Sequence, residues 1–340
     1  MSFEHTLPVE CELPVPLDAV PDIRNWSENY CQQAYDPSSG FGFWFHLGLP
    51  VYDQGLWHDK TLVYLPGGEE LLVSKGYTSR HCAMDSGPAG SALRGEYLQD
   101  SAEWVWHFHG AAHRVNRHEL AGGLKPDSQV EPLRFELRYR GLAPVWDLSR
   151  QVRQQVWSVN GAHWEQPCTV TGWVEYAGQR HAIEGTGVRD HSRGARDFSS
   201  MGSHYWLHGQ FPSGRAFGVI HVEPGNPHSD VLSHAYVVVD GRLAPAEVVS
   251  LPQDRTFSSP FEIRFTDARG VQRVIGELIH EMPMTLRYPN HLLFGHDRSQ
   301  PGHLLYEGQI RWQWDGETGY GLGERTQRLS GGERGEPSFI

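Results

Sequence analysis

A run of ionisable residues lies near the middle of the chain, between two β-rich regions. Residues 185–197 read Gly-Thr-Gly-Val-Arg-Asp-His-Ser-Arg-Gly-Ala-Arg-Asp and precede an aromatic segment at 203–208. A carboxyl group buried against aromatic walls stays protonated until it reacts, which is what protonation of an alkene requires. We therefore predict Asp190 as a catalytic acid. If Arg193 keeps Asp190 ionised, His191 becomes the acid and Asp190 its orienting partner.

The same cluster has a structural interpretation, in which Arg–Asp pairs brace a loop. The catalytic interpretation also needs groups that stabilise a carbocation without attacking it, and aromatic faces do this at about 0.5–2 kcal/mol each. Candidate walls are Trp44, Trp206 and Tyr236. Trp106 is a further candidate, although Trp104, Trp106 and Phe108 form a stripe at strand spacing that is typical of an ordinary core.

A weak internal repeat indicates that the two halves of the chain have the same architecture. Phe43-Trp44-Phe45-His46-Leu47-Gly48 is similar to Tyr205-Trp206-Leu207-His208-Gly209, with Trp and His two positions apart in each. His46 and His208 therefore join the predicted substrate-binding residues.

The polar run resembles the Asp-centred motif of the carotenoid 1,2-hydratase (hydroxyneurosporene synthase) and AttH-like superfamily, in which a Gly, an Asp and a basic neighbour precede a Trp-bearing strand. Here Ser192-Arg193 stand where that family commonly has Glu-Trp. A second match near the end comprises Leu305-Tyr306-Glu307-Gly308 and Gly319-Tyr320-Gly321-Leu322-Gly323-Glu324. It adds Tyr306, Glu307, Tyr320 and Glu324 to the predicted substrate-binding residues.

The resemblance covers about residues 40 to 330 in layout. It implies two lipocalin-like antiparallel β-barrel or sandwich domains around a ligand cavity. It also implies acid-initiated chemistry without a cofactor on an isoprenoid or similar hydrophobic molecule: hydration, dehydration, isomerisation or cyclisation, by a lyase or an isomerase.

Two other functions remain open. A non-catalytic carrier of a hydrophobic ligand would need only the aromatic cavity. A metal-dependent, cupin-like enzyme would use His107 and His109, which share a strand face, but the Glu that cupins place shortly after is replaced by His113. We expect no metal, and the glycine-rich runs lack the strand-to-helix context of a nucleotide site.

Strand patterns dominate the chain. Residues 133–140 alternate apolar and charged types without fault, and similar runs occur at 61–65, 103–109, 169–176, 205–211, 216–222, 234–239, 261–265 and 309–314. Turn signals at 66–68, 212–214, 240–241 and 315–316 predict antiparallel hairpins. The best helix candidate is Pro21 to Tyr35. We predict an all-β protein.

Length and charge limit the remaining choices. A chain of 340 residues favours two domains, and we place them at 1–150, with the short leading helix, and 151–340, with the Asp-His motif. A formal charge of −12 opposes binding to nucleic acid. No apolar window approaches the length of a membrane span, and the four scattered cysteines indicate reduced thiols. We therefore expect a cytoplasmic protein, either monomeric or homodimeric.

Overall fold

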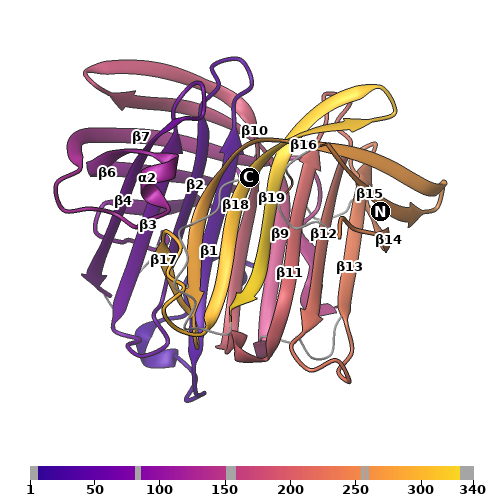
Figure 1. Cartoon of the computed structure of the whole chain (residues 1–340), viewed down its shortest axis with the longest axis horizontal. Helices are drawn as coiled ribbons and strands as arrows, with labels where there is room; N and C mark the ends of the chain where they lie inside the picture. Colours follow the sequence, from indigo (N-terminus) through magenta and orange to yellow (C-terminus); the bar gives the residue numbers. More distant parts are fainter. Residues whose placement is uncertain (1–6, 81–85, 151–157, 254–256, 258–259, 330–340) are drawn as a thin grey trace. The chain divides into compact units, whose positions relative to one another are not determined.

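The computed structural model describes residues 7–80, 86–150, 158–253, 257 and 260–329. Strands dominate this part of the chain, and they pair in an antiparallel arrangement (Figure 1). The helical segments are short: α1 (Val9–Glu12), α2 (Arg117–Leu120) and three 3₁₀ turns at Leu17–Ala19, Leu148–Arg150 and Phe198–Ser200. Within these residues no helix has the length and hydrophobicity to cross a membrane. The prediction of an all-β fold is confirmed.

The chain forms two compact units. The first contains the described residues up to 115 together with 126–196, and the second contains 116–125 and the described residues from 197 onward. The boundary predicted near residue 150 falls inside the first unit. The Asp190 motif therefore belongs to the first unit and not to the second.

The first unit is a ring of antiparallel strands. Their order is β10-β1-β2-β3-β4-β6-β7-β9, and pairing of β9 with β10 closes the ring, while β5 and β8 pair with β6 and β9. The bounds are β1 (Trp26–Tyr35), β2 (Gly42–Gly48), β3 (Leu56–Tyr64), β4 (Glu70–Ser79), β5 (Leu93–Leu98), β6 (Glu103–Asn116), β7 (Gln129–Gly141), β8 (Trp146–Asp147), β9 (Ser158–Tyr176) and β10 (Gln179–Arg196).

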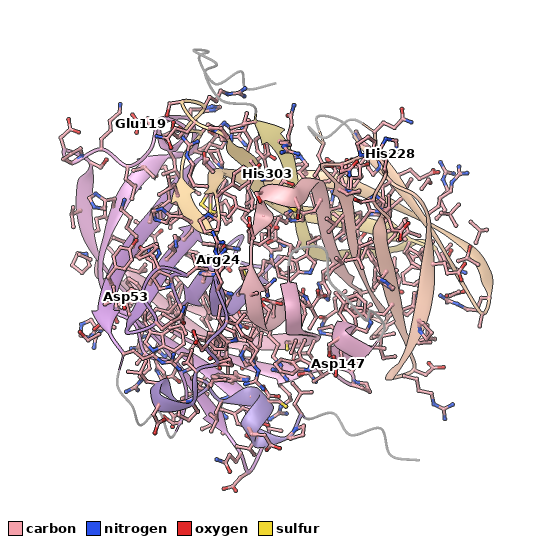
Figure 2. All side chains as sticks on the ribbon, turned by 90° about the horizontal axis from the view of Figure 1, so that it is seen from below. Arg24, Asp53, Glu119, Asp147, His228 and His303 are labelled. Carbon is pink, nitrogen blue, oxygen red and sulfur yellow. The ribbon has the colours of Figure 1, made fainter. Side chains whose placement is uncertain are left out.

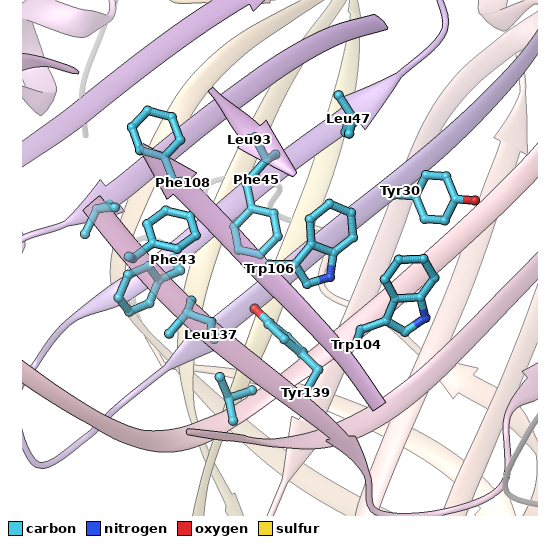
Figure 3. Close-up of a cluster of buried hydrophobic side chains, with 14 of the residues drawn as sticks. Tyr30, Phe43, Phe45, Leu47, Leu93, Trp104, Trp106, Phe108, Leu137 and Tyr139 are labelled. Carbon is cyan, nitrogen blue, oxygen red and sulfur yellow. The ribbon is translucent and has the colours of Figure 1, made fainter. Parts of the chain in front are cut away.

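Aromatic and aliphatic side chains fill this ring. Figure 3 shows Tyr30, Phe45, Trp104, Trp106 and Tyr139 gathered from several strands. In β7 the residues from Leu133 to Arg140 alternate between buried and more exposed, as the sequence pattern predicts. The side of each strand that faces this cluster is called the inner face below, and the opposite side the outer face.

The second unit is built in the same way. Its strand order is β15-β14-β13-β12-β11-β19-β18-β16-β17, and β15 pairs with β16 as well as β14. The bounds are β11 (Met201–Gln210), β12 (Ala216–Pro224), β13 (Leu232–Val239), β14 (Arg242–Ser250), β15 (Phe261–Asp267), β16 (Gly270–Arg287), β17 (His291–Phe294), β18 (Gly302–Trp314) and β19 (Glu317–Leu329).

Burial separates two kinds of polar residue in the second unit. Glu119 and His228 are exposed, whereas His303 is fully buried and its Nε2 lies 3.0 Å from the Met201 carbonyl oxygen (Figure 2). The inner core of this unit is aromatic, with Phe217 and Trp312 in edge contact at 5.1 Å.

The predicted turns join neighbouring antiparallel strands. Gly67 and Gly68 adopt positive φ between β3 and β4, and residues 212–214 connect β11 to β12. Asp240-Gly241 and Asp315-Gly316 both adopt positive φ at successive residues, the geometry that two-residue hairpins need. These turn predictions are confirmed.

The helix predicted from Pro21 to Tyr35 is wrong. Residues 26–35 form β1, which pairs with β10 on one side and β2 on the other. Every residue of β1 is buried, so neither face shows the polar alternation that identifies a strand. A strand buried on both faces is the reason that periodicity failed here.

Candidate functional site

The polar run forms β10, and its alternation sends adjacent residues to opposite faces. His191 pairs with Tyr30, a residue of the inner core, so His191 and Arg193 point to the inner face. Asp190 pairs with Cys31 and with Glu165, and it points to the outer face. The structure therefore does not bring Asp190 and His191 together.

On the inner face His191 is part of a buried network. Its Nε2 lies 3.0 Å from Glu28 Oε1, and its ring stacks on Tyr30 at 4.0 Å. Burial lowers the pKa of His191, although Glu28 opposes this effect. Arg193 lies 3.8 Å from the same Glu28 oxygen and above the Trp164 ring. His191 and Arg193 therefore both contact Glu28 on the inner face.

An ion pair anchors α1 to the same inner face. Arg189 donates two hydrogen bonds to the Glu12 carboxylate, at 2.7 and 2.8 Å, and a third to Gln166. The Trp104 indole N–H donates to Glu12 at 3.0 Å. Burial alone would raise the pKa of Glu12, but Arg189 outweighs it and lowers the pKa.

On the outer face Asp190 meets an imidazole and a second carboxyl group. His163 Nε2 lies 3.2 Å from Asp190 Oδ2 and 2.7 Å from Glu165 Oε1. Glu165 is fully buried and Asp190 is 5% exposed. The imidazole has at most one hydrogen on Nε2, so this atom can donate to only one of the two carboxylates at a time.

The row of cross-strand pairs continues from Asp190 along the outer face. Asp190 pairs with Cys31, Cys31 with His46, and His46 with Lys60. Trp44 lies two residues before His46, and the two rings stack at 6.2 Å. Burial, together with nearby Lys60 and Arg196, lowers the pKa of His46 to about 3, so this imidazole is neutral.

In the second unit the outer face is likewise the side of each strand that points away from the aromatic core of that unit. Several predicted residues share this face on β11 and its neighbours. Trp206 pairs with Glu324, and His208 pairs with Gly218, which pairs with Tyr236. The Tyr236 ring covers Gly218, where a Cβ atom would approach its Cε1 to 2.2 Å. Burial lowers the pKa of His208 to about 3.

Two glutamates lie opposite each other on this second face. Tyr306 pairs with Arg325 and Gln309 with Leu322, so the same register places Glu307 opposite Glu324. His204 Nε2 contacts Glu324 Oε1, and the His204 backbone N–H donates to Thr326 Oγ1 at 2.9 Å. Sequence similarity predicted Glu307 and Glu324 but not their partner His204.

Three further predicted residues have surroundings that differ from those of the residues above. Trp106 is fully buried in the packed core of the first unit (Figure 3). Tyr306 points to the inner face of the second unit, where the Arg325 guanidinium lies 4.4 Å above its ring. Tyr320 is partly exposed and pairs with Gln210 on the outer face.

The histidines proposed for a metal do not form a cluster. His107 lies 3.8 Å from Glu96 and 3.6 Å from Glu136, and His109 is exposed. Among the described residues, no group of three or more His, Cys, Asp or Glu side chains could hold a metal ion.

Sequence reasoning missed several residues of the first outer face. His163 and Glu165 are two positions apart, as are His58 and Lys60, and each pair shares one face of its strand. Polar residues at period two inside β-rich segments are the signal that would have identified them. Their approach to Asp190 or His46 depends on pairing between strands far apart in sequence.

Solved structures with the same fold were found at low sequence identity. Kievitone hydratase from Nectria haematococca has a TM-score of 0.56 at 11% identity, covering 97% of this chain and 94% of that one. A structure assigned as AttH from Nitrosomonas europaea has a TM-score of 0.56 at 11% identity, covering 94% and 98%. CghA with Sch210972 has a TM-score of 0.54 at 11% identity, covering 91% and 90%.

These likenesses agree with the fold that the AttH-like resemblance implies. No curated protein matches the sequence. One family, described as a domain of unknown function (DUF7064), matches residues 16–328, which is most of the chain. The chain therefore belongs to the DUF7064 family.

Proposed function

We propose that this protein is a cofactor-independent acid/base enzyme, a lyase or an isomerase, that acts on a hydrophobic small molecule at the outer face of its first unit. The observation that carries the proposal is the contact of His163 Nε2 with both Asp190 and Glu165, at 3.2 and 2.7 Å. Two carboxyl groups and one imidazole in a buried setting can hold a proton and release it to a bound substrate.

The chemistry requires only protons and water. Asp190 gives its proton to one carbon of an alkene, and the neighbouring carbon becomes cationic. Addition of water, whose proton passes to the Asp190–His163–Glu165 group, gives an alcohol. Loss of an adjacent proton to the same group gives an isomer, and the reverse of the addition is dehydration. Trp44, on the same face, is positioned to contribute an aromatic surface.

Likeness to kievitone hydratase and to an AttH structure supports this choice of reaction class, because both have the same fold. An isoprenoid or terpenoid alkene is the substrate class that we propose to test first. A non-catalytic carrier would explain the aromatic surfaces as well as an enzyme does. It would not explain why His163 contacts both Asp190 and Glu165.

Incorporation of deuterium from D₂O tests the proposal without knowledge of the net reaction. The wild-type protein is incubated with a panel of terpenoid alkenes and alcohols, and mass spectrometry follows exchange and gain or loss of water. Asp190→Asn should lower the rate about 10²–10⁴-fold, since an amide cannot deliver the proton. Asp100→Asn, at an exposed position, is the matched control.

Thermal stability is measured on the same preparations. If Asp190 only braces the strand, Asp190→Asn will lower the melting temperature while the folded fraction keeps its wild-type rate. That result, or a wild type that labels none of the panel, contradicts the proposal. Glu324, in contact with His204, is then the next acid to replace.

A further inference from the structure

A lysine lies in the same row of side chains as the proposed acid. Lys60 is on the outer face of β3, where it pairs with His46, and it is only 2% exposed. A lysine is rarely buried to this degree, because removing an ammonium from water is costly unless a carboxylate accompanies it. The surroundings of its Nζ atom therefore indicate which form the side chain adopts.

Those surroundings suit a neutral amine. Nζ lies 2.8 Å from His58 Nδ1, and no carboxylate among the described residues lies within 4.0 Å of it. The adjacent Asp59 points to the inner face, where Ser91 and Ala92 donate hydrogen bonds to it. An ammonium group has three hydrogens to donate and finds one acceptor here.

Burial of the side chain also favours the neutral amine. Burial lowers the pKa of Lys60 to about 7; the nearby Asp59 opposes this effect and Lys75 adds to it. The facing His46 is neutral, so it offers no negative charge. Near neutral pH a large fraction of Lys60 is therefore unprotonated and able to accept a proton.

Two ring nitrogen atoms on the same outer face as Lys60 are available for a hydrogen bond with an oxygen atom of a ligand. Among the residues that the structure describes, Trp44 Nε1 and His46 Nδ1 are buried without a hydrogen-bond partner. An indole N–H only donates, so its natural partner is an oxygen atom. Indoles in the packed core, such as that of Trp106, are also unpartnered. Trp44 and His46 differ from these core indoles because they lie on the outer face, in the same row of side chains as the Lys60 amine and other polar groups.

We propose that Lys60, with Trp44 and His46, binds the acidic hydroxyl group of the substrate, a phenol or an enol. The O–H bond breaks, its proton joins Nζ to give an ammonium, and the oxygen keeps the electron pair as phenolate or enolate. The indole N–H of Trp44 donates to that oxygen. This inference rests on the proposed function and narrows its substrate to oxygenated hydrophobic molecules, excluding plain hydrocarbons.

Three matched probes test the inference: naphthalene, 2-methoxynaphthalene and 2-naphthol. They share one ring system, and only 2-naphthol has a hydroxyl proton. We expect the wild-type protein to bind 2-naphthol about ten- to a hundredfold more tightly than the methoxy compound, the range for a hydrogen bond to a charged group. Bound 2-naphthol should also show the red-shifted absorbance of its anion.

Two substitutions and a control identify the group responsible. Lys60→Met should remove the preference for 2-naphthol and the anion absorbance, and Lys60→Arg should remove the anion absorbance because arginine stays protonated. Lys125→Met is the control, since Lys125 is exposed and belongs to the second unit. Calorimetry gives the affinities and absorbance gives the ionisation state.

Equal affinity of the wild type for 2-naphthol and 2-methoxynaphthalene overturns the inference. So does a preference that persists in Lys60→Met, or a wild type that binds none of the three probes. Failure of the proposed function is recognised separately: Asp190→Asn should lose turnover of alkenes and keep the preference for 2-naphthol.

Discussion

Replacement of Lys60 by methionine should stabilise the protein, by an amount that depends on pH. The side chain is 2% exposed and its Nζ has His58 as its hydrogen-bond partner. A pKa that falls from 10.5 to about 7 corresponds to about 5 kcal/mol, at about 1.4 kcal/mol for each pKa unit. This is the free energy that the folded protein loses when it must hold Lys60 charged.

The sign follows from proton binding in the two states. Below about pH 7 Lys60 is protonated both folded and unfolded, so the full destabilisation applies. Between about pH 7 and 10.5 the unfolded chain binds more protons, and stability of the wild type rises with pH. Above pH 10.5 the amine is neutral in both states and the effect has gone.

Urea unfolding followed by tryptophan fluorescence measures this difference. Lys60→Met should exceed the wild type by up to about 5 kcal/mol at pH 6 and by only about 1 kcal/mol at pH 10. Lys125→Met, at an exposed position of the second unit, should match the wild type at both values. An advantage that is absent at pH 6, or unchanged at pH 10, would refute the conclusion that Lys60 is buried as an amine.

Two further predictions concern other buried groups. Arg189→Met should destabilise the first unit by about 3–5 kcal/mol, because Glu12 is left charged and buried. Adding Glu12→Gln should recover part of that loss. Equal unfolding midpoints for the wild type and Arg189→Met would contradict this prediction. His208, whose pKa burial lowers to about 3, should make the wild type lose stability as pH falls from 6.5 toward 3, by about 1.4 kcal/mol per pH unit. His208→Phe should lack this contribution, so acid transitions that coincide in both proteins would show that His208 is solvated in the folded state.

The structure places the residues that the sequence predicts for the site in two kinds of surroundings. Asp190 is buried with ionisable partners, and Trp44, His46, Trp206 and His208 lie on outer faces. Trp106, by contrast, belongs to the packed core, and Tyr306 lies on an inner face. A stripe of aromatic residues at strand spacing looks the same whether it faces a core or a ligand.

By itself, the sequence determines the all-β fold, the turns and the strands that alternate in polarity, because period-two alternation and residues that tolerate positive φ are local properties. It also requires Asp190 and His191 to point apart once both lie in one strand. It does not determine β1, which is buried on both faces. Only the tertiary structure decides the partners. His163 reaches Asp190 through the register of β9 with β10, and Lys60 reaches His46 through the pairing of β3 with β2. Register is set by packing and hydrogen bonding across the whole sheet, and the surroundings of a buried charge depend on it.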